Sequence, residues 1–316
     1  PAYCYSYSKL RENIKSFKEN FKSFSPLICF SVKSNTNVNL IREIKKFGLG
    51  ADVVSKGELM LALKAGVNPN VLFIGDISDG SIKIIKKINL IKIPTFVILG
   101  NHDRGKDSTG ETLLKQIRIL QEKYCAWDLK IFNNQLNILS ARPCSSGGGY
   151  YLSNEVKAVY GPISEQESVN KMLKCSEKNS RELPLVFMSH AGPSGLGSDS
   201  KSICGKDWKE PSCDWGDRDL AVAISEIQKK RKIDLVIFGH MHNRLKRNQG
   251  LRNMFKIDKE GTAYLNSAIV PRYKNNVDGQ LLVNFSWVEF VDNEISHISH
   301  RWYSESGEIC EEEILF

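Results

Sequence analysis

Side chains that can bind a metal follow four short apolar runs in this sequence of 316 residues. They supply carboxylate and amide oxygens and imidazole nitrogens, a mixture that favours Mn, Fe, Zn or Mg over Cu(I). Four of the six histidines of the chain follow these runs or their small turn residues. We therefore predict one shared metal site, and its candidate ligands are Asp76, Asn101, His190, His240 and His242.

The positions of these ligands imply a particular kind of scaffold. Each apolar run is short and ends in Gly or Ser before the polar side chain, which is typical of a buried strand that stops at a tight turn. The four segments are 71–76, 96–104, 183–192 and 233–242. Ligands bind beyond the carboxyl ends of the strands in open α/β sheets. We expect these turns to meet in one crevice, although any single histidine taken alone would be more typical of a core or capping residue.

Bulk composition places the chain among ordinary globular proteins. It is 41% hydrophobic and 25% charged, and no apolar run approaches the roughly 18 residues of a membrane span. The N-terminus lacks a secretory pattern, and the eight cysteines contain no C-x-x-C pair, which favours reduced thiols and a cytoplasmic location. The net charge of +8 is concentrated in residues 1–70. It is weak grounds for a nucleic-acid partner, and we expect neither nucleic acid nor membrane binding.

The first part of the chain alternates short helical and strand patterns. Apolar residues recur at helical spacing over 9–24, and Gly48 and Gly50 end a second helix. The pattern predicts helices at 9–24, 39–47 and 56–65, and strands at 27–32 and 51–54. This βαβα order, leading to the strand at residue 71, is typical of parallel sheets and barrels.

This N-terminal part resembles a specific family. The motifs are P-A-Y-C-Y at the start, I-C-F-S-V-K-S-N-T-N at 28–37, and L-G-A-D-V-V-S-K-G-E-L-M-L-A-L-K-A-G at 49–66. They are similar to diaminopimelate decarboxylase, an enzyme of the alanine-racemase-like fold that uses pyridoxal phosphate (PLP). The resemblance covers about residues 1–73 and implies that Lys33 matches the lysine that forms the Schiff base. The rest of an eight-stranded barrel does not follow, so we do not expect PLP at Lys33.

The remainder of the chain, about residues 71–316, resembles a second family. Gly75-Asp76, Gly100-Asn101-His102-Asp103, Ser189-His190 and Gly239-His240-Met241-His242 occur in the order of the calcineurin-like metallophosphoesterases. The resemblance implies an α/β fold in which two mixed sheets form a sandwich flanked by helices. It also implies two divalent metal ions at the strand ends, which would be Mn, Fe, Zn or Mg.

The resemblance assigns a role to each candidate ligand. Asp76 would bridge the two ions, and His242 would belong to the first metal site. The second site would be completed by Asn101, His190 and His240.

Two further residues receive catalytic roles from the same resemblance. His102 would face the substrate as general acid or as a charge stabiliser. Asp79 would orient His102 from the second shell of the site. The substrate class that this implies is a phosphate ester of unidentified structure.

One motif of the phosphoesterase family is missing. The family opens with Asp-x-His upstream of Gly-Asp, and no histidine precedes Asp76. The equivalent turn would place Ser55 and Gly57 at those positions, and neither can replace a carboxylate or an imidazole. Because two-metal hydrolysis needs both ions around the phosphoryl group, we predict metal binding with impaired turnover.

The two resemblances predict a chain made of two parts. Residues 1–70 would be a partial PLP-decarboxylase-like barrel fragment, and residues 71–316 a phosphoesterase domain, joined near Phe73 by a gene fusion or an assembly artefact. Three functions remain open: a metal-dependent phosphoester hydrolase, a PLP-dependent decarboxylase-type fragment, and a non-catalytic metal-binding protein.

Overall fold

The computed structural model of the chain describes residues 6–20, 29–47, 49–52, 70–133, 135–178, 182–246, 250–291 and 293–316. The chain divides into two compact units. One unit consists of residues 70–272 with Leu315, and the other of residues 1–69 with 273–314 and Phe316. The predicted ligands all fall within residues 70–272. The predicted domain division into 1–70 and 71–316 stays a prediction.

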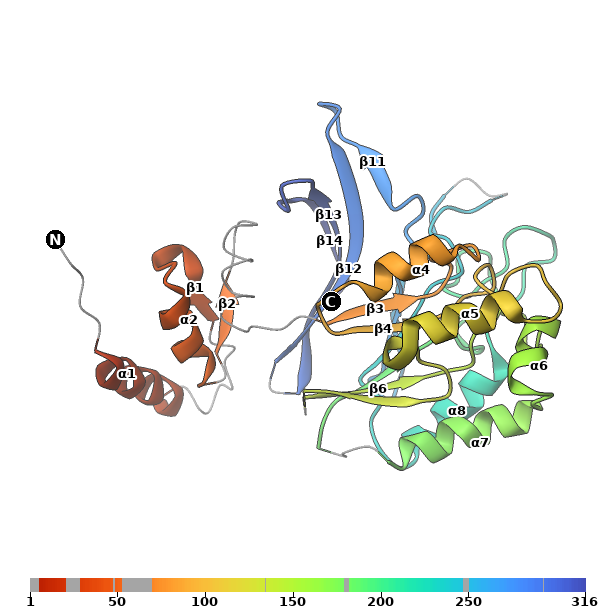
Figure 1. Ribbon diagram of the computed structural model, residues 1–316, viewed down its shortest axis with the longest axis horizontal. Coiled ribbons are helices and arrows are strands. Elements are labelled where there is room, and N and C mark those ends of the chain that lie inside the picture. Colours follow the sequence, from red (N-terminus) through yellow and green to blue (C-terminus); the bar gives the residue numbers. More distant parts are fainter. Residues whose placement is uncertain are drawn as a thin grey trace. The chain divides into compact units, whose positions relative to one another are not determined.

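The N-terminal part contains a small βαβ arrangement (Figure 1). Strands β1 (Cys29–Ser31) and β2 (Gly50–Asp52) pair in parallel, with α2 (Val38–Lys45) between them in the sequence. The side chain of Asn37 caps α2 by accepting hydrogen bonds from the amides of Asn39 and Leu40, as N-cap residues do. Helix α1 (Tyr7–Asn20) and the short 3₁₀ helix η2 (Val32–Ser34) are the other described elements here. The helix predicted at 56–65 lies outside the described residues.

The C-terminal part forms an antiparallel sheet. Among the described residues its order is β11 (Tyr273–Asn275), β12 (Leu281–Val291), β13 (Glu294–Ser304) and β14 (Ile309–Ile314). The longest pairing joins β12 to β13, from Leu282 opposite Ser304 to Val291 opposite Glu294. Side chains therefore alternate between the two faces of this sheet along each strand.

The unit at 70–272 opens with a second βαβ arrangement. Strand β3 (Val71–Ile74) pairs in parallel with β4 (Thr95–Ile98), and α4 (Ile82–Asn89) connects them. Parallel neighbours need such a crossover, which brings their carboxyl ends to the same edge. The turns after Ile74 and after Ile98 are therefore adjacent.

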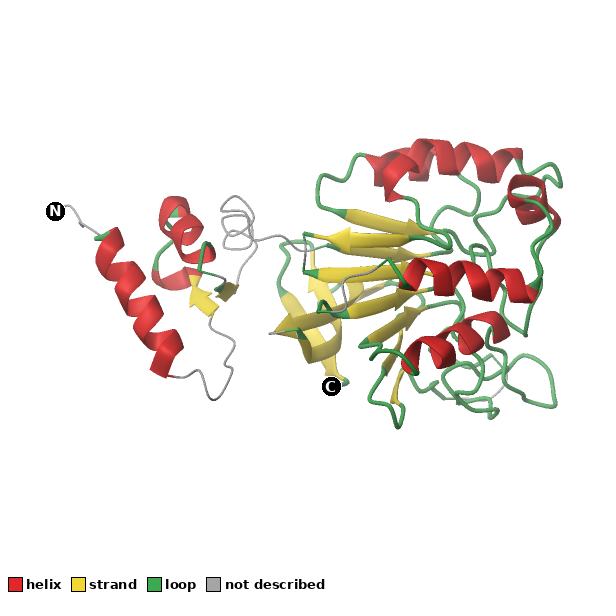
Figure 2. Ribbon diagram, turned by 90° about the horizontal axis from the view of Figure 1, so that it is seen from below, coloured by secondary structure: helices red, strands yellow, loops and turns green. Residues whose placement is uncertain are grey.

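A larger mixed sheet contains the other described strands of this unit (Figure 2). Within the described part of the chain its order is β5 (Leu129–Phe132), β6 (Leu136–Ser140), β7 (Leu185–Met188), β8 (Leu235–Phe238), β10 (Ala263–Asn266) and β9 (Phe255–Ile257). The strands from β6 to β10 in this order are parallel, and β5 and β9 pair antiparallel at the two edges. Every residue of β7 and β8 is buried, which explains their uninterrupted apolar runs.

Helices cover these sheets and share one apolar core with them. They are α4, α5 (Glu111–Leu120), α6 (Asn154–Tyr160), α7 (Glu165–Ser176) and α8 (Arg218–Gln228), with the 3₁₀ helix η3 (Gln121–Lys123) after α5. Helix α4 packs on α5, and α7 packs on α8. The core joins Val97 of β4 and Phe187 of β7 to Leu113 of α5 and Leu220 of α8.

The α/β class with mixed sheets is thus confirmed. The strand ends of β3 and β4 are linked to those of β7 and β8, because the His190 ring bonds the backbone carbonyl of Ile74. The described cysteines carry free thiols. Among the described residues, none of the helices is both long enough and apolar enough to span a membrane.

Candidate metal centre

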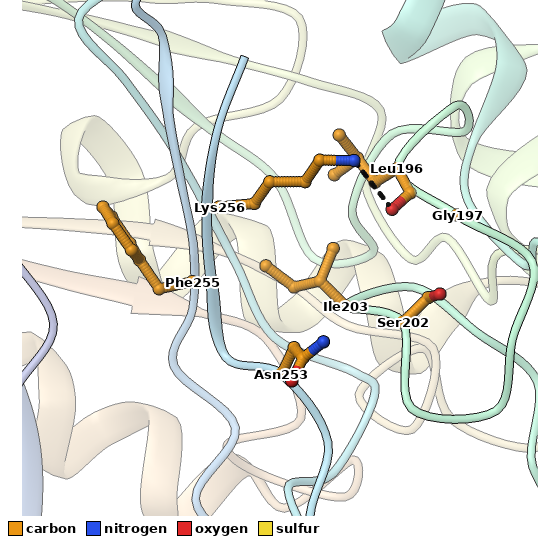
Figure 3. Close-up of a pocket in the computed structure, with 7 residues that line it drawn as sticks. All are labelled: Leu196, Gly197, Ser202, Ile203, Asn253, Phe255 and Lys256. Atoms are coloured by element: carbon orange, nitrogen blue, oxygen red, sulfur yellow. Dashed lines mark hydrogen bonds between the residues drawn. The ribbon is translucent and has the colours of Figure 1, made fainter.

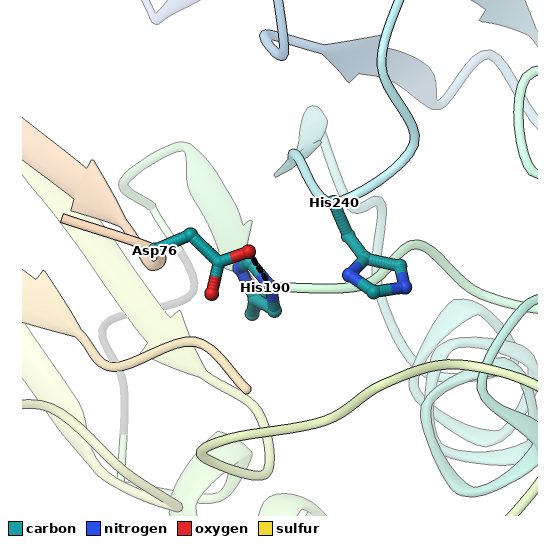
Figure 4. A group of neighbouring side chains, drawn as sticks. All are labelled: Asp76, His190 and His240. Atoms are coloured by element: carbon teal, nitrogen blue, oxygen red, sulfur yellow. Dashed lines mark ion pairs between the residues drawn. The ribbon is translucent and has the colours of Figure 1, made fainter. Parts of the chain in front are cut away.

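Three predicted ligands lie together at the strand ends (Figure 4). Asp76 follows β3, His190 follows β7 and His240 follows β8. One ligand atom from each residue lies within 4.8 Å of the other two. His190 is buried, His240 is half-buried, and Asp76 is open to solvent on one side. The structure therefore brings together residues that are 114 and 50 positions apart in the sequence.

Asn101 adds a fourth donor to this group. Its side-chain oxygen Oδ1 lies 3.0 Å from Nε2 of His190. Oδ2 of Asp76 lies 3.3 Å from the same nitrogen. One imidazole nitrogen thus faces an amide oxygen and a carboxylate oxygen, and the His190 and His240 rings are 5.1 Å apart between centroids. This mixture of donors suits a divalent first-row cation.

The orientation of the His190 ring is fixed by a backbone carbonyl. Nδ1 of His190 lies 2.7 Å from the carbonyl oxygen of Ile74, so Nε2 is left to face the other ligands. The backbone of Ser146 acts on His240 in the direction that raises its pKa, but burial outweighs this effect. Metal-binding histidines characteristically bond a carbonyl or carboxylate through the nitrogen that does not bind the ion.

Two glycines allow the strand ends to approach the His190 ring. A Cβ atom on Gly75 would overlap Nδ1 of His190, and one on Gly100 would overlap the Asp76 carboxylate. Gly75 also has φ +92°, and Asp76 and His240 have φ of 53° and 63°. Such left-handed conformations are uncommon for residues other than glycine, and they cluster at functional sites. The glycine in each turn is therefore required by close packing around the ligands.

The charges of the group are coupled. Burial opposes ionisation of Asp76, but the charge of His190 and hydrogen bonds from the His190 ring and the His102 amide hold the pKa of Asp76 well below its usual value. Burial likewise disfavours protonation of His190, yet the Asp76 carboxylate raises the pKa of His190. Burial and the neighbouring His190 lower the pKa of His240 to about 3. His240 is therefore neutral at physiological pH, as a ligand must be.

Asp103 holds two of the ligand-bearing turns together, a role that was not predicted for it. It is fully buried, and its Oδ2 accepts a hydrogen bond of 2.8 Å from the Gly100 amide. Its Oδ1 accepts from the Ile77 amide at 3.0 Å and from the Ser78 amide at 2.7 Å. The Ser78 hydroxyl also donates to Oδ1 at 2.8 Å. One carboxylate thus ties the turn after β3 to the turn after β4.

His102 and Asp79 are solvent-exposed residues of the turns that carry Asn101 and Asp76. The His102 amide donates to Oδ1 of Asp76 at 2.9 Å, so its backbone is anchored to the ligand group. Nδ1 of His102 is 3.9 Å from Oδ1 of Asp79, and the two side chains are 65% and 81% exposed. The pair is therefore a loose surface contact. Their predicted catalytic roles stay predictions.

The remaining predicted positions are His242, the turn with Ser55 and Gly57, and Lys33. The exposed side chain of His242 does not belong to the Asp76, His190 and His240 group found among the described residues. The backbone turn predicted to carry Ser55 and Gly57 lies outside the described residues. Lys33 lies in η2 with its side chain exposed.

A hollow of about 440 Å³ lies elsewhere in the same unit (Figure 3). Apolar side chains of Leu196, Ile203 and Phe255 line it, and Lys256 donates a hydrogen bond of 3.2 Å to the Leu196 carbonyl across it. None of the predicted metal ligands lines this hollow. This hollow is therefore distinct from the predicted metal site.

An α/β fold with carboxylate, amide and imidazole donors at its strand ends defines a metal-binding protein of the metallophosphoesterase type. A model of the calcineurin-like phosphoesterase family matches residues 54–244. This match covers more than half of the chain, and the chain therefore belongs to the calcineurin-like phosphoesterase family. The family uses divalent metals, and its phosphoesterase activity implies phosphate esters as substrates.

A second family model, the pyridoxal-binding domain of pyridoxal-dependent decarboxylases, matches residues 7–93. The predicted N-terminal resemblance is thus confirmed. The two matches overlap between residues 54 and 93, which includes strand β3. The overlap is consistent with a fused chain in which strand β3 fits the sequence pattern of both families.

Individual relatives match only part of the chain. Diaminopimelate decarboxylase of Helicobacter pylori (strain J99) is 30% identical over 123 residues, which are 38% of this chain and 30% of that enzyme. The Neisseria meningitidis serogroup A enzyme is 42% identical over 66 residues, covering 21% and 16% of the two chains. This chain therefore spans less than a third of these curated relatives. A dimetal phosphatase from Danio rerio is similar in structure, with 10% identity, a TM-score of 0.40 and 89% of each chain covered.

Proposed function

We propose that this protein is a metal-dependent phosphoester hydrolase with one complete metal site and correspondingly weak turnover. The proposal depends chiefly on the convergence of Asp76, His190 and His240 within 4.8 Å. Asn101 lies against His190 in the same group. The donor set and the carbonyl-bound ring of His190 fit one divalent cation.

Each residue of the group has a definite task in this reaction. Four residues would hold a divalent cation at the edge of the sheet: Asp76, Asn101, His190 and His240. A divalent cation supplies charge that acidifies water and neutralises phosphoryl oxygens. His102, exposed and anchored through its amide to Asp76, donates a proton to the leaving oxygen as general acid.

The weakness of the reaction follows from the other metal site. Asp76 and His242 remain for this first site, but the sequence offers Ser55 and Gly57 where the family has Asp and His. A single cation can hold the phosphoryl group on one side only. Two-metal enzymes clamp both the attacking and the leaving oxygen, so we expect turnover well below that of an intact family member.

The same observation favours a second candidate function. If the remaining site binds its ion but cannot orient a phosphoryl group, the protein is a non-catalytic metal-binding protein. The two functions share the ligand group and differ only in turnover. Metal content and hydrolysis must therefore be measured on the same preparation.

The test compares the full chain with its His190→Ala and Asn101→Ala variants. Bound metal is measured after loading with Mn²⁺, and hydrolysis is followed with a chromogenic phosphomonoester and a phosphodiester. His297→Ala serves as the control, because His297 is a partly exposed histidine of β13 paired with Glu312.

We expect both ligand variants to lose bound metal and hydrolysis together, while the control variant keeps both. Metal binding without hydrolysis in the unchanged chain would favour the second candidate. Hydrolysis as fast as in an intact family member would contradict the inferred defect in the first metal site.

A further inference from the structure

The hollow of about 440 Å³ beside Leu196 has the composition of a site for a small ligand. Small-molecule pockets measure roughly 300–1,000 Å³ and are mostly apolar, with a few polar groups that fix the orientation of the ligand. Leu196, Ile203 and Phe255 supply the apolar part of this lining, and none of the lining residues is acidic. An apolar molecule that enters the hollow therefore leaves water without meeting a negative charge.

Lys256 places one ammonium group at this hollow. It extends from β9, and its Nζ donates a hydrogen bond of 3.2 Å to the Leu196 carbonyl (Figure 3). A lysine ammonium has three donor hydrogens, so two remain for a ligand. Within the described part of the chain, Lys256 forms no ion pair with a carboxylate. The positive charge at the hollow therefore has room for an anion.

Two neutral polar side chains complete the lining. They are Ser202 and Asn253, and neither side chain hydrogen-bonds to another group in the described ranges of the chain. With Lys256 they offer an ammonium, a hydroxyl and an amide NH₂ as donors, and a carboxylate has two oxygens to accept from them. One ammonium balances the single charge of a carboxylate, but only part of the charge of a phosphate group. The donors therefore match a carboxylate.

The wall of the hollow at residues 196–203 is held in place from the interior. The buried Arg252 donates hydrogen bonds of 3.0 Å and 2.8 Å to the carbonyls of Ser200 and Ser202. Gly197 has φ +125°, and a Cβ atom there would come within 2.5 Å of the Ser202 hydroxyl. This wall exists before any ligand arrives, and a preformed site loses less conformational entropy on binding.

We propose that this hollow binds a small carboxylate with an apolar body. Lys256, Ser202 and Asn253 hold the carboxylate group, while Leu196 and Ile203 cover the apolar body. The hollow shares no lining residue with the Asp76, His190 and His240 group. The proposal is therefore independent of the hydrolase function.

Calorimetric titration of the full chain with octanoate, 1-octanol and butanoate tests the charge and the apolar body separately. We expect octanoate to bind about tenfold more tightly than 1-octanol, because the alcohol cannot form a charge-assisted hydrogen bond with Lys256. Octanoate should also bind about tenfold more tightly than butanoate, because the shorter chain buries fewer methylene groups.

Three variants test the assigned residues. Lys256→Met keeps the length of the side chain without its charge, and it should reduce octanoate affinity about tenfold while leaving 1-octanol affinity unchanged. Asn253→Ala should reduce octanoate affinity about threefold, as expected for one hydrogen bond. Lys259→Met is the matched control, because Lys259 is an exposed lysine that pairs with Glu260 and does not line the hollow. Thermal melting of each variant checks that it is folded.

Equal affinities for octanoate and 1-octanol in the unchanged chain would overturn the proposal. A preference for octanoate that survives in folded Lys256→Met would also overturn it, and octanoate bound at the metal centre would give this same result. Equal losses in Lys256→Met and Lys259→Met would show attraction to surface charge in general, which contradicts a defined site. If Lys256→Met does not fold, unchanged octanoate affinity in Asn253→Ala contradicts the site, because the exposed Asn253 side chain can be removed without loss of a described hydrogen bond.

Discussion

Replacement of Asp103 by Asn should damage the metal centre although Asp103 is not one of the proposed ligands. Its buried carboxylate accepts hydrogen bonds from the amides of Gly100, Ile77, Ser78 and Asp79. These donors belong to the two turns that carry Asp76 and Asn101. An amide side chain has the same shape but offers one acceptor oxygen in place of two.

The cost can be worked from these contacts. If the Asn NH₂ group faces Gly100, a buried backbone N–H loses its acceptor, which costs about 1–3 kcal/mol. The bonds that remain change from charge-assisted to neutral and lose about half their strength. Part of this loss is offset because a neutral amide is easier to bury than a carboxylate. We expect a net destabilisation of about 3 kcal/mol.

Chemical denaturation of the chain and Mn²⁺ titration measure the two consequences. Loosening of the turns should weaken Mn²⁺ binding by about 10–100-fold, the range for loss of a residue that supports a metal ligand. Asp107→Asn is the matched control. Asp107 accepts hydrogen bonds from the Glu111 amide and the Thr109 hydroxyl, but none from the ligand-bearing turns. The Asp107→Asn variant should leave Mn²⁺ affinity unchanged. An Asp103→Asn variant with the stability and affinity of the unchanged chain would refute the role assigned to this carboxylate.

Three further predictions concern the same chain. Gly100→Ala should abolish Mn²⁺ binding in calorimetry, because the new Cβ would overlap the Asp76 carboxylate and lie 2.7 Å from the His190 ring; unchanged affinity would show that the turn can relax. The Asp76 carboxylate raises the pKa of His190, and Mn²⁺ must displace the proton that His190 then carries. Mn²⁺ affinity should therefore fall about tenfold for each pH unit below the pKa of His190. An affinity that stays constant between about pH 5 and 8 would contradict this prediction. Lys33→Ala should leave hydrolysis and the visible spectrum unchanged, and a yellow PLP absorbance that disappears in this variant would support the decarboxylase alternative.

Much of the centre could be predicted because its residues follow regular strands. The apolar runs ending at Asp76, His190 and His240 identified both the strands and the edge at which they end. Parallel pairing makes this edge common to all of them. The local patterns therefore predicted which turns would meet, because the direction of parallel strands determines the edge at which their turns lie.

The remaining features depend on contacts that no local pattern contains. Asp103 resembles any polar turn residue until the burial of its carboxylate and its donors from the preceding turn are seen. Gly147 and Gly148 make room for the ring of Trp215 in the structure. That contact spans 67 positions of sequence. No local sequence pattern marks either feature, because both arise from tertiary packing.

The number of Mn²⁺ ions bound by each chain tests the central claim most directly. Calorimetric titration of the metal-free full chain, repeated with His190→Ala, gives both the stoichiometry and its dependence on the ligand group. We predict one tightly bound ion in the unchanged chain and none in the variant. Two tight ions in the unchanged chain, or one ion that persists in His190→Ala, would contradict the single site formed by Asp76, Asn101, His190 and His240.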